Sequence, residues 1–118
     1  MNSYDFDGVL YMGDSVKGVR PDPEDVIVTG RTYQEREFVL EVLGRRGLKN
    51  MVFLQSLPIA ARTRETSGVH KGRTLRNLLD LGAEIKLHFE DDEIQATIIR
   101  EMVPEVTVVV LVHDLTEK

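Results

Sequence analysis

The sequence predicts an α/β fold, a three-layer Rossmann-like arrangement around a five-stranded parallel sheet. Three observations support this prediction. The chain has 118 residues, which suits a single domain spanning residues 1–118. Its hydrophobic content of 42% is enough for a core. Short apolar runs alternate with helical patterns over most of the chain, as they do where helices cover a parallel sheet.

Five short apolar runs are the candidate strands, and they are Met1–Phe6, Val26–Thr29, Met51–Leu54, Ile85–Phe89 and Val106–Val112. The second and the last are rich in Val and Ile and nearly continuous. That pattern is typical of strands buried on both faces. The first run is short and partly polar, so its pattern is the weakest.

Three helical patterns lie between the later runs. The spacing Thr32-x-x-Glu35 is that of a capping box and predicts a helix start. The apolar stripes are Phe38, Val39, Val42 and Leu43 for the first helix, Leu75, Leu78 and Leu79 for the second, and Ile94, Ile98, Ile99 and Met102 for the third. Gly44 and Gly47 are expected to close the first helix, Gly82 the second and Pro104 the third.

Two connections are unusual. Val9–Asp25 shows no helical period and contains Pro21 and Pro23, so we expect a loop or a short hairpin there. Gln55–His70 is long for a loop in a compact domain, and such loops often carry function.

Composition narrows the classes of site and partner. The chain has no cysteine and three widely separated histidines, which excludes disulfides and opposes a zinc site. Plentiful carboxylates instead suit a hard cation such as Mg²⁺. A net charge of −5 opposes bulk binding of nucleic acid. No apolar run reaches membrane-spanning length and no signal peptide precedes the first run, so we expect a cytoplasmic protein without membrane contact.

Polar side chains follow four of the predicted strands. The exits carry Asp5-Phe6-Asp7-Gly8, Thr29-Gly30-Arg31, a segment ending in His70-Lys71, and Glu90-Asp91-Asp92. Because parallel strands deliver their carboxyl ends to one edge of the sheet, we expect these groups to meet there.

This set of side chains suits phosphoryl transfer. Of Asp5 and Asp7, one carboxylate can attack phosphorus and the other can move the proton. The Thr29 hydroxyl and the Lys71 ammonium can bind phosphoryl oxygens, although Lys71 could also be a solvated lysine in a first helical turn. Gly30, Arg31 and Arg20 are candidate substrate contacts, with solvated loop residues as the alternative for the arginines.

The acidic trio Glu90-Asp91-Asp92 allows more than one assignment. Asp92 stands three residues before Gln95 at the start of the third helix, so it can be an N-cap as well as a metal ligand. Asp91 at the strand tip is then the better candidate for a metal ligand, with Glu90 in support.

The motifs resemble a known family. Asp5-Phe6-Asp7-Gly8-Val9-Leu10, Val28-Thr29-Gly30-Arg31, Lys71 and Phe89-Glu90-Asp91-Asp92, in this order, resemble the haloacid dehalogenase-like (HAD-like) phosphatase superfamily. Arg20, Arg31 and Phe89-Glu90-Asp91 also look like the phosphatase half of polynucleotide kinase-phosphatases.

The resemblance implies a role for each acid of the first motif. Asp5 is then the nucleophile that forms an aspartyl-phosphate, and Asp7 is the acid that protonates the leaving oxygen and then activates water. It implies Mg²⁺ bound by the Asp5 side chain, the Asp7 backbone carbonyl and Asp91, with Asp92 a further candidate ligand. Val9–Asp25 is too short for a helical cap domain, so we expect a capless member, which implies large substrates or a site closed by a homo-oligomer.

The expected activity is hydrolysis of a phosphomonoester carried by a small molecule, a nucleotide or a nucleic-acid end. Between Arg62 and Arg76, five basic side chains and one acidic side chain give a local charge of +4, which suits such a substrate. Two alternatives remain. One is phosphoryl transfer to an acceptor other than water, and the other is a non-catalytic binding or assembly protein on a reduced scaffold.

Overall fold

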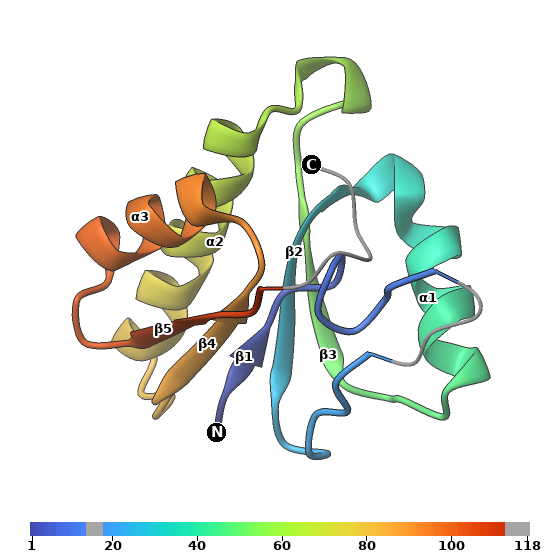
Figure 1. Ribbon diagram of the computed structural model, residues 1–118, viewed down its shortest axis with the longest axis horizontal. Helices are drawn as coiled ribbons and strands as arrows, with labels where there is room; N and C mark the ends of the chain where they lie inside the picture. Colours follow the sequence, from blue (N-terminus) through green and yellow to red (C-terminus); the bar gives the residue numbers. More distant parts are fainter. Residues whose placement is uncertain (14–17, 113–118) are drawn as a thin grey trace.

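The computed structural model describes residues 1–13 and 18–112, so residues 14–17 of the predicted first connection and 113–118 of the predicted domain lie outside the described residues. The strands are β1 (Ser3–Tyr4), β2 (Val26–Thr32), β3 (Met51–Gln55), β4 (Leu87–Glu90) and β5 (Thr107–Val110). The helices are α1 (Arg36–Arg45), α2 (Arg64–Asp80) and α3 (Glu93–Met102), with short 3₁₀ turns η1 (Tyr33–Glu35) and η2 (Ile59–Ala61). The α/β class and the five-stranded parallel sheet are therefore confirmed (Figure 1).

The order of the strands across the sheet is β3-β2-β1-β4-β5, and every pairing is parallel. The chain starts in the middle of the sheet with β1, adds β2 and β3 on one side, and then adds β4 and β5 on the other. The order in which strands are added therefore reverses between β1 and β4. Tyr4 pairs with Ile27 of β2 and with Phe89 of β4. Asp5, which follows β1, and Glu90, the last residue of β4, therefore lie side by side at the switch point, where open α/β sheets bind ligands.

Two apolar cores fix the layers. Ile27 packs with Val39 and Leu43 of α1, whereas Val26 and Val28 pack in the other core, with residues of α2 and α3. The alternation follows from the two-residue period of a strand. In Figure 1, α1 lies on one side of the sheet and α2 and α3 lie on the other, which gives three layers.

The second predicted helix begins earlier than expected, so the predicted loop Gln55–His70 is wrong beyond Thr63. The first turns of α2 lack an apolar stripe and contain Gly68 and Gly72, which lowers their helix propensity. A Cβ on Gly72 would lie 2.6 Å from the Met102 sulfur, and one on Gly68 would lie 3.0 Å from Ile98 Cδ1. Small residues at these positions let α2 approach α3 closely.

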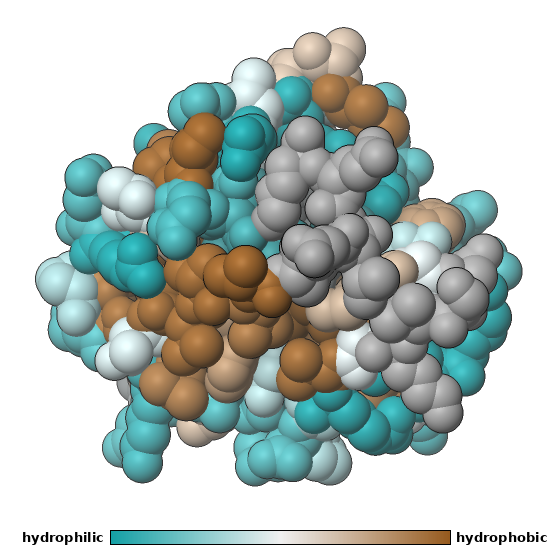
Figure 2. All heavy atoms as spheres, in the orientation of Figure 1, coloured by the Kyte–Doolittle hydropathy of each residue, from teal (hydrophilic) through white to brown (hydrophobic). Residues whose placement is uncertain are grey.

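Outside the helices, the first connection contains turns and no helix over residues 9–13 and 18–25, as expected. Apolar side chains gather over the edge strand β5 (Figure 2), where Val110, Leu111 and Val112 line a shallow depression beside Asp91 and Asp92. Among the described residues, none of the helices combines the length and the apolar character needed to cross a bilayer.

Candidate active site

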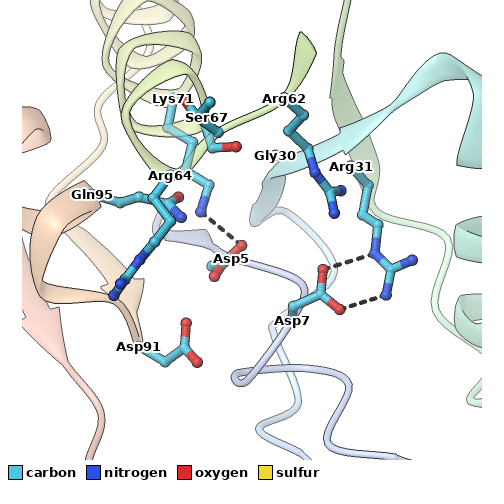
Figure 3. A pocket seen from close by; sticks show the side chains of 11 residues that line it. Asp5, Asp7, Gly30, Arg31, Arg62, Arg64, Ser67, Lys71, Asp91 and Gln95 are labelled. Atoms are coloured by element: carbon cyan, nitrogen blue, oxygen red, sulfur yellow. Dashed lines mark hydrogen bonds and ion pairs between the residues drawn. The ribbon is translucent and has the colours of Figure 1, made fainter. Parts of the chain in front are cut away.

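A cavity of about 470 Å³ opens at the carboxyl ends of the central strands (Figure 3). The exit of β1 supplies Asp5 and Asp7, and the end of β2 supplies Gly30 and Arg31. The remaining lining residues come from the start of α2 and from the segments after β4, and they are Arg62, Thr63, Arg64, Ser67, Lys71, Asp91 and Gln95. The structure thus brings together the exits of β1, β2 and β4 with the helix that carries Lys71.

Asp5 is a buried carboxylate at the floor of this cavity. Its Oδ1 accepts a hydrogen bond from the Phe6 backbone N–H at 2.8 Å and forms an ion pair with Lys71 Nζ at 2.9 Å. Burial, together with the nearby Glu90 carboxylate, raises the pKa of Asp5 well above its usual value, and Lys71 offsets only part of this. A further cation close to Asp5 would therefore stabilise the ionised form of its carboxylate.

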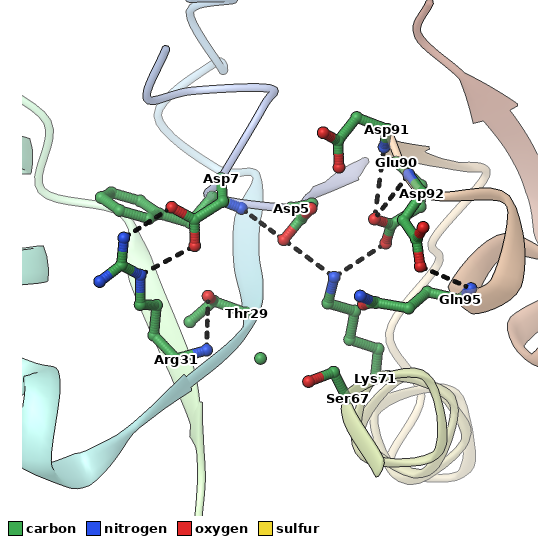
Figure 4. A network of polar contacts seen from close by, with 12 residues as sticks. Asp5, Asp7, Thr29, Arg31, Ser67, Lys71, Glu90, Asp91, Asp92 and Gln95 are labelled. Carbon is green, nitrogen blue, oxygen red and sulfur yellow. Dashed lines mark hydrogen bonds and ion pairs between the residues drawn. The ribbon is translucent and has the colours of Figure 1, made fainter. Parts of the chain in front are cut away.

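Lys71 joins the two buried carboxylates. Its side chain is 1% exposed, and its Nζ lies 2.9 Å from both Asp5 Oδ1 and Glu90 Oε1 (Figure 4). Burial alone would lower the pKa of Lys71, but the two carboxylates outweigh burial and raise it, so the ammonium form is stabilised. The residue lies in the interior of α2, about two turns after Arg64, so its placement in a first helical turn is wrong.

Behind Lys71, a buried polar chain continues along the same face of the sheet toward the amino ends of β4 and β1. Glu90 Oε1 lies 3.1 Å from His88 Nε2, and His88 Nδ1 lies 2.7 Å from the Ser3 hydroxyl. Burial lowers the pKa of His88, which favours the neutral ring. Because the Glu90 carboxylate can only accept, Nε2–H donates to Glu90 and Nδ1 accepts from Ser3. Lys71 and His88 outweigh burial and lower the pKa of Glu90.

The acidic cluster suited to a cation consists of Asp5, Glu90 and Asp91, whose nearest carboxylate oxygens all lie within 4.8 Å of one another. Glu90 already accepts from Lys71 and His88, and its second oxygen accepts from the backbone N–H groups of Asp91 and Asp92 at 3.3 and 3.4 Å. Asp5 and Asp91 line the cavity and Glu90 does not, so Asp5 and Asp91 are the better ligand candidates. Oxygen donors of this kind suit Mg²⁺.

Gly8 allows Asp91 to lie against the loop after β1. Its φ of +78° is in the left-handed region that glycine tolerates best. A Cβ at this position would lie 1.8 Å from Asp91 Oδ2, so no larger residue fits without moving the carboxylate. The glycine of the Asp5-Phe6-Asp7-Gly8 motif thus has a geometric role in the acidic cluster.

Asp92 was expected as a possible metal ligand, but its carboxylate is used elsewhere. It caps α3 by accepting from the Gln95 backbone N–H at 3.2 Å, and it forms an ion pair with Arg64. Burial would raise the pKa of Asp92, but the Arg64 contact and the cap lower it. Asp92 also lies outside the acidic cluster of the described residues, so the N-cap alternative holds.

On the opposite side of the cavity, Asp7 is bound by Arg31. Arg31 Nε and Nη2 donate to the two Asp7 oxygens at 2.9 and 2.8 Å, and its Nη1 donates to Glu35 at 2.7 Å. The Asp7 hydrogen bonds outweigh burial and raise the pKa of Arg31. Its guanidinium also lies 4.9 Å from the centre of the Phe38 ring. Glu35 also forms an ion pair with Arg62, whose Nη1 lies 2.9 Å from Glu35 Oε1. Among the described residues, the Asp7 carboxylate does not belong to the acidic cluster of Asp5, Glu90 and Asp91.

Three further candidates take different positions. The Thr29 side chain is fully buried, and its hydroxyl accepts from the Arg31 backbone N–H at 3.0 Å. Gly30 lines the cavity, where a Cβ would lie 2.4 Å from Ser67 Oγ. Arg20 does not reach the cavity. It donates to the Arg46 carbonyl at 2.7 Å and lies with Pro21, Lys49 and Asn50 at the amino ends of β2 and β3, the opposite edge of the sheet.

The cavity residues that sequence reasoning missed include Thr63 and Ser67 at the start of α2, together with Gln95 of α3. Thr63 caps α2 by accepting from the Thr66 backbone N–H at 3.0 Å. Threonine at both Thr63 and Thr66 was the available signal for this helix start. Ser67 lies one turn before Lys71, so both side chains face the cavity from one side of the helix.

Comparisons of the chain with protein-family models, with curated proteins and with solved structures found no match.

Proposed function

We propose that this protein is a Mg²⁺-dependent phosphatase that hydrolyses a phosphomonoester through an aspartyl-phosphate on Asp5, and that it is a capless member of the HAD-like superfamily. One observation carries the proposal. Asp5 is a buried carboxylate at the switch point of a parallel sheet, paired with Lys71 at 2.9 Å and adjacent to Asp91. A nucleophile, a fixed cation and a second acid are thereby gathered at one position in the cavity.

In the first step, an Asp5 carboxylate oxygen forms a bond to phosphorus while the bond to the leaving oxygen breaks. The proton on Asp7 passes to that leaving oxygen. In the second step, water attacks phosphorus, Asp7 takes its proton, and the phosphorus–Asp5 bond breaks with the electron pair returning to the carboxylate. Phosphate leaves, and both acids return to their starting forms.

Asp7 must leave part of its contact with Arg31 to move a proton. Both of its oxygens accept from Arg31, at 2.8 and 2.9 Å, so one of these hydrogen bonds has to open. The pair is partly exposed, with the Asp7 side chain 43% accessible, so opening it costs little. Arg31 then stays close enough to bind a phosphoryl oxygen beside Gly30.

The Lys71 ammonium, held in place by Glu90, compensates the charge of Asp5 and of the phosphoryl group. The Arg31 guanidinium is the further phosphate contact of this proposal, and the buried Thr29 hydroxyl supports it by accepting from the Arg31 backbone N–H. Asp5 and Asp91 would hold Mg²⁺ together with the Asp7 backbone carbonyl, and Asp92 is not needed for it. When bound, the ion neutralises charge on the phosphoryl oxygens.

The test is phosphate release from para-nitrophenyl phosphate with and without Mg²⁺. Asp5→Asn keeps the shape of the side chain and removes the nucleophile, so Mg²⁺-dependent release should fall to background. Asp80→Asn, at the exposed end of α2, makes the same chemical change outside the cavity and should leave the rate unchanged. Full activity of Asp5→Asn would refute the assignment of the nucleophile.

A further inference from the structure

The short segment Arg62–Arg64 lines the cavity and carries an arginine at each end. Thr63, between the two arginines, caps α2. In Figure 3 the two guanidinium groups extend to different sides of Asp5, with Arg62 near Asp7 and Arg31 and with Arg64 near Asp91. The segment therefore faces both the leaving-group side and the metal side of the proposed reaction.

An acid on each wall of the cavity holds one of these arginines. Arg62 Nη1 contacts Glu35 Oε1 at 2.9 Å, and Arg64 Nη2 contacts Asp92. The acids are more buried than their partners, with Glu35 13% and Asp92 7% exposed, and each is fixed by a helix-capping bond. The guanidinium groups are thus positioned before any ligand arrives.

Arg62 has more hydrogen-bond donors left for a ligand than Arg31 has. Arg31 donates through Nε, Nη1 and Nη2 to Asp7 and Glu35. The contact of Arg62 within the described chain uses Nη1 alone, and its side chain is 34% exposed. An arginine has five N–H donors in a planar fork that matches an anionic oxygen pair.

We propose that Arg62 forms a second anion subsite, so that preferred substrates carry a second phosphate or comparable anionic group on the leaving-group side of the scissile phosphate. This inference rests on the proposed function. Asp7 protonates the leaving oxygen, so the leaving group lies on the wall formed by Asp7, Arg31 and Arg62. The cavity of about 470 Å³ is in the size range of small-molecule sites and has room for more than one phosphoryl group.

The test compares kcat/KM within pairs of substrates that differ by one phosphate. The pairs are adenosine 3′,5′-bisphosphate with adenosine 5′-monophosphate, and fructose 1,6-bisphosphate with fructose 6-phosphate. The wild type should prefer the bisphosphate about tenfold in at least one pair, the size expected for one charge-assisted hydrogen bond. The pair in which the preference occurs distinguishes a nucleotide from a sugar substrate.

Arg62→Gln should remove this preference while leaving turnover of the monophosphates nearly unchanged. Arg64→Gln is the matched control, because it removes the same charge from the same segment on the metal side, and it should keep the preference. Arg73→Gln, on α2 beside a separate groove, should keep it too. Equal rates for both members of each pair, or an equal loss on both with Arg62→Gln, would overturn the proposal.

Binding separates this inference from the proposed function. Calorimetric titration with adenosine 3′,5′-bisphosphate and with fructose 1,6-bisphosphate needs no turnover. About tenfold weaker binding of either by Arg62→Gln supports the subsite even in a protein that hydrolyses none of the substrates. Unchanged binding of both by that variant contradicts the subsite even in an active phosphatase.

Discussion

Each of the two walls of the cavity contains a basic side chain between two acidic ones, but one of these groups is buried and the other is partly exposed. On one wall Lys71 joins Asp5 and Glu90, and all three side chains are at most 6% exposed. On the other wall Arg31 joins Asp7 and Glu35 with its own side chain 22% exposed. A buried charge left without its partner is costly, whereas a partly exposed pair can exchange partners with water or ligand. We infer that the buried wall fixes the nucleophile and that the exposed wall adapts to the substrate.

The largest expected effect comes from removing the central cation of each wall. Lys71→Met leaves two buried carboxylates without a cation and should lower the free energy of unfolding by about 3–5 kcal/mol. Arg31→Met should lower it by only about 1 kcal/mol, because Asp7 can turn to water. Urea denaturation of both variants without Mg²⁺ measures the difference. Equal losses would remove the distinction between the walls.

Gly8→Ala should be the next largest effect, because it adds a collision with Asp91 to the strain of a positive φ. We expect a loss of about 2–4 kcal/mol and weaker Mg²⁺ binding. Gly82→Ala is the control. It also has a positive φ, but a Cβ there meets nothing within 4 Å, so it should cost about 1 kcal/mol and leave Mg²⁺ binding unchanged. Equal Mg²⁺ affinities in the two variants would show that Gly8 has no role in the acidic cluster.

Asp5→Asn should make the protein more stable by about 1–2 kcal/mol at neutral pH without Mg²⁺. The folded-state pKa of Asp5 is raised, so the stability linked to its protonated form is complete below about 3.8 and is lost as the pH rises through the folded pKa. The advantage of the variant should therefore shrink as the pH falls. Mg²⁺ should stabilise the wild type and not the variant. Thermal unfolding at several pH values, with and without Mg²⁺, checks both signs.

The smallest effect tests the far end of the buried wall. Ser3→Ala removes the hydroxyl that donates to His88 and should cost about 1 kcal/mol in urea denaturation. Thr74→Ala, which removes a half-buried hydroxyl that donates to the His70 carbonyl within α2, is the matched control and should cost less. A loss in Ser3→Ala no larger than that in Thr74→Ala would show that the polar chain ends at His88.

Much of the fold could be predicted from the sequence because strand patterns and helix caps are local signals. Asp92 illustrates both the reach and the limit of such signals. Its N-cap role follows from its spacing to Gln95, but its ion pair with Arg64 depends on where α2 starts. The first turns of α2 could not be predicted from hydrophobic periodicity, because the glycines that face α3 leave no apolar stripe.

Contacts between residues of different elements could not be predicted from the sequence either. The order of the strands decides that Asp5 and Glu90 are neighbours. Likewise, the bidentate contact between Arg31 of β2 and Asp7 in the loop after β1 has no local signature. Motif order indicated which residues gather, and tertiary packing decides which of them touch.

The most direct test of the central claim is to trap the covalent intermediate. Wild-type protein mixed with para-nitrophenyl phosphate and Mg²⁺ is quenched in acid, digested and examined by mass spectrometry. We predict one phosphoryl group on the peptide that contains Asp5, removable with hydroxylamine and missing in Asp5→Asn. Phosphate release at full rate with no phosphorylated Asp5, or with the phosphoryl group on another residue, would contradict the account.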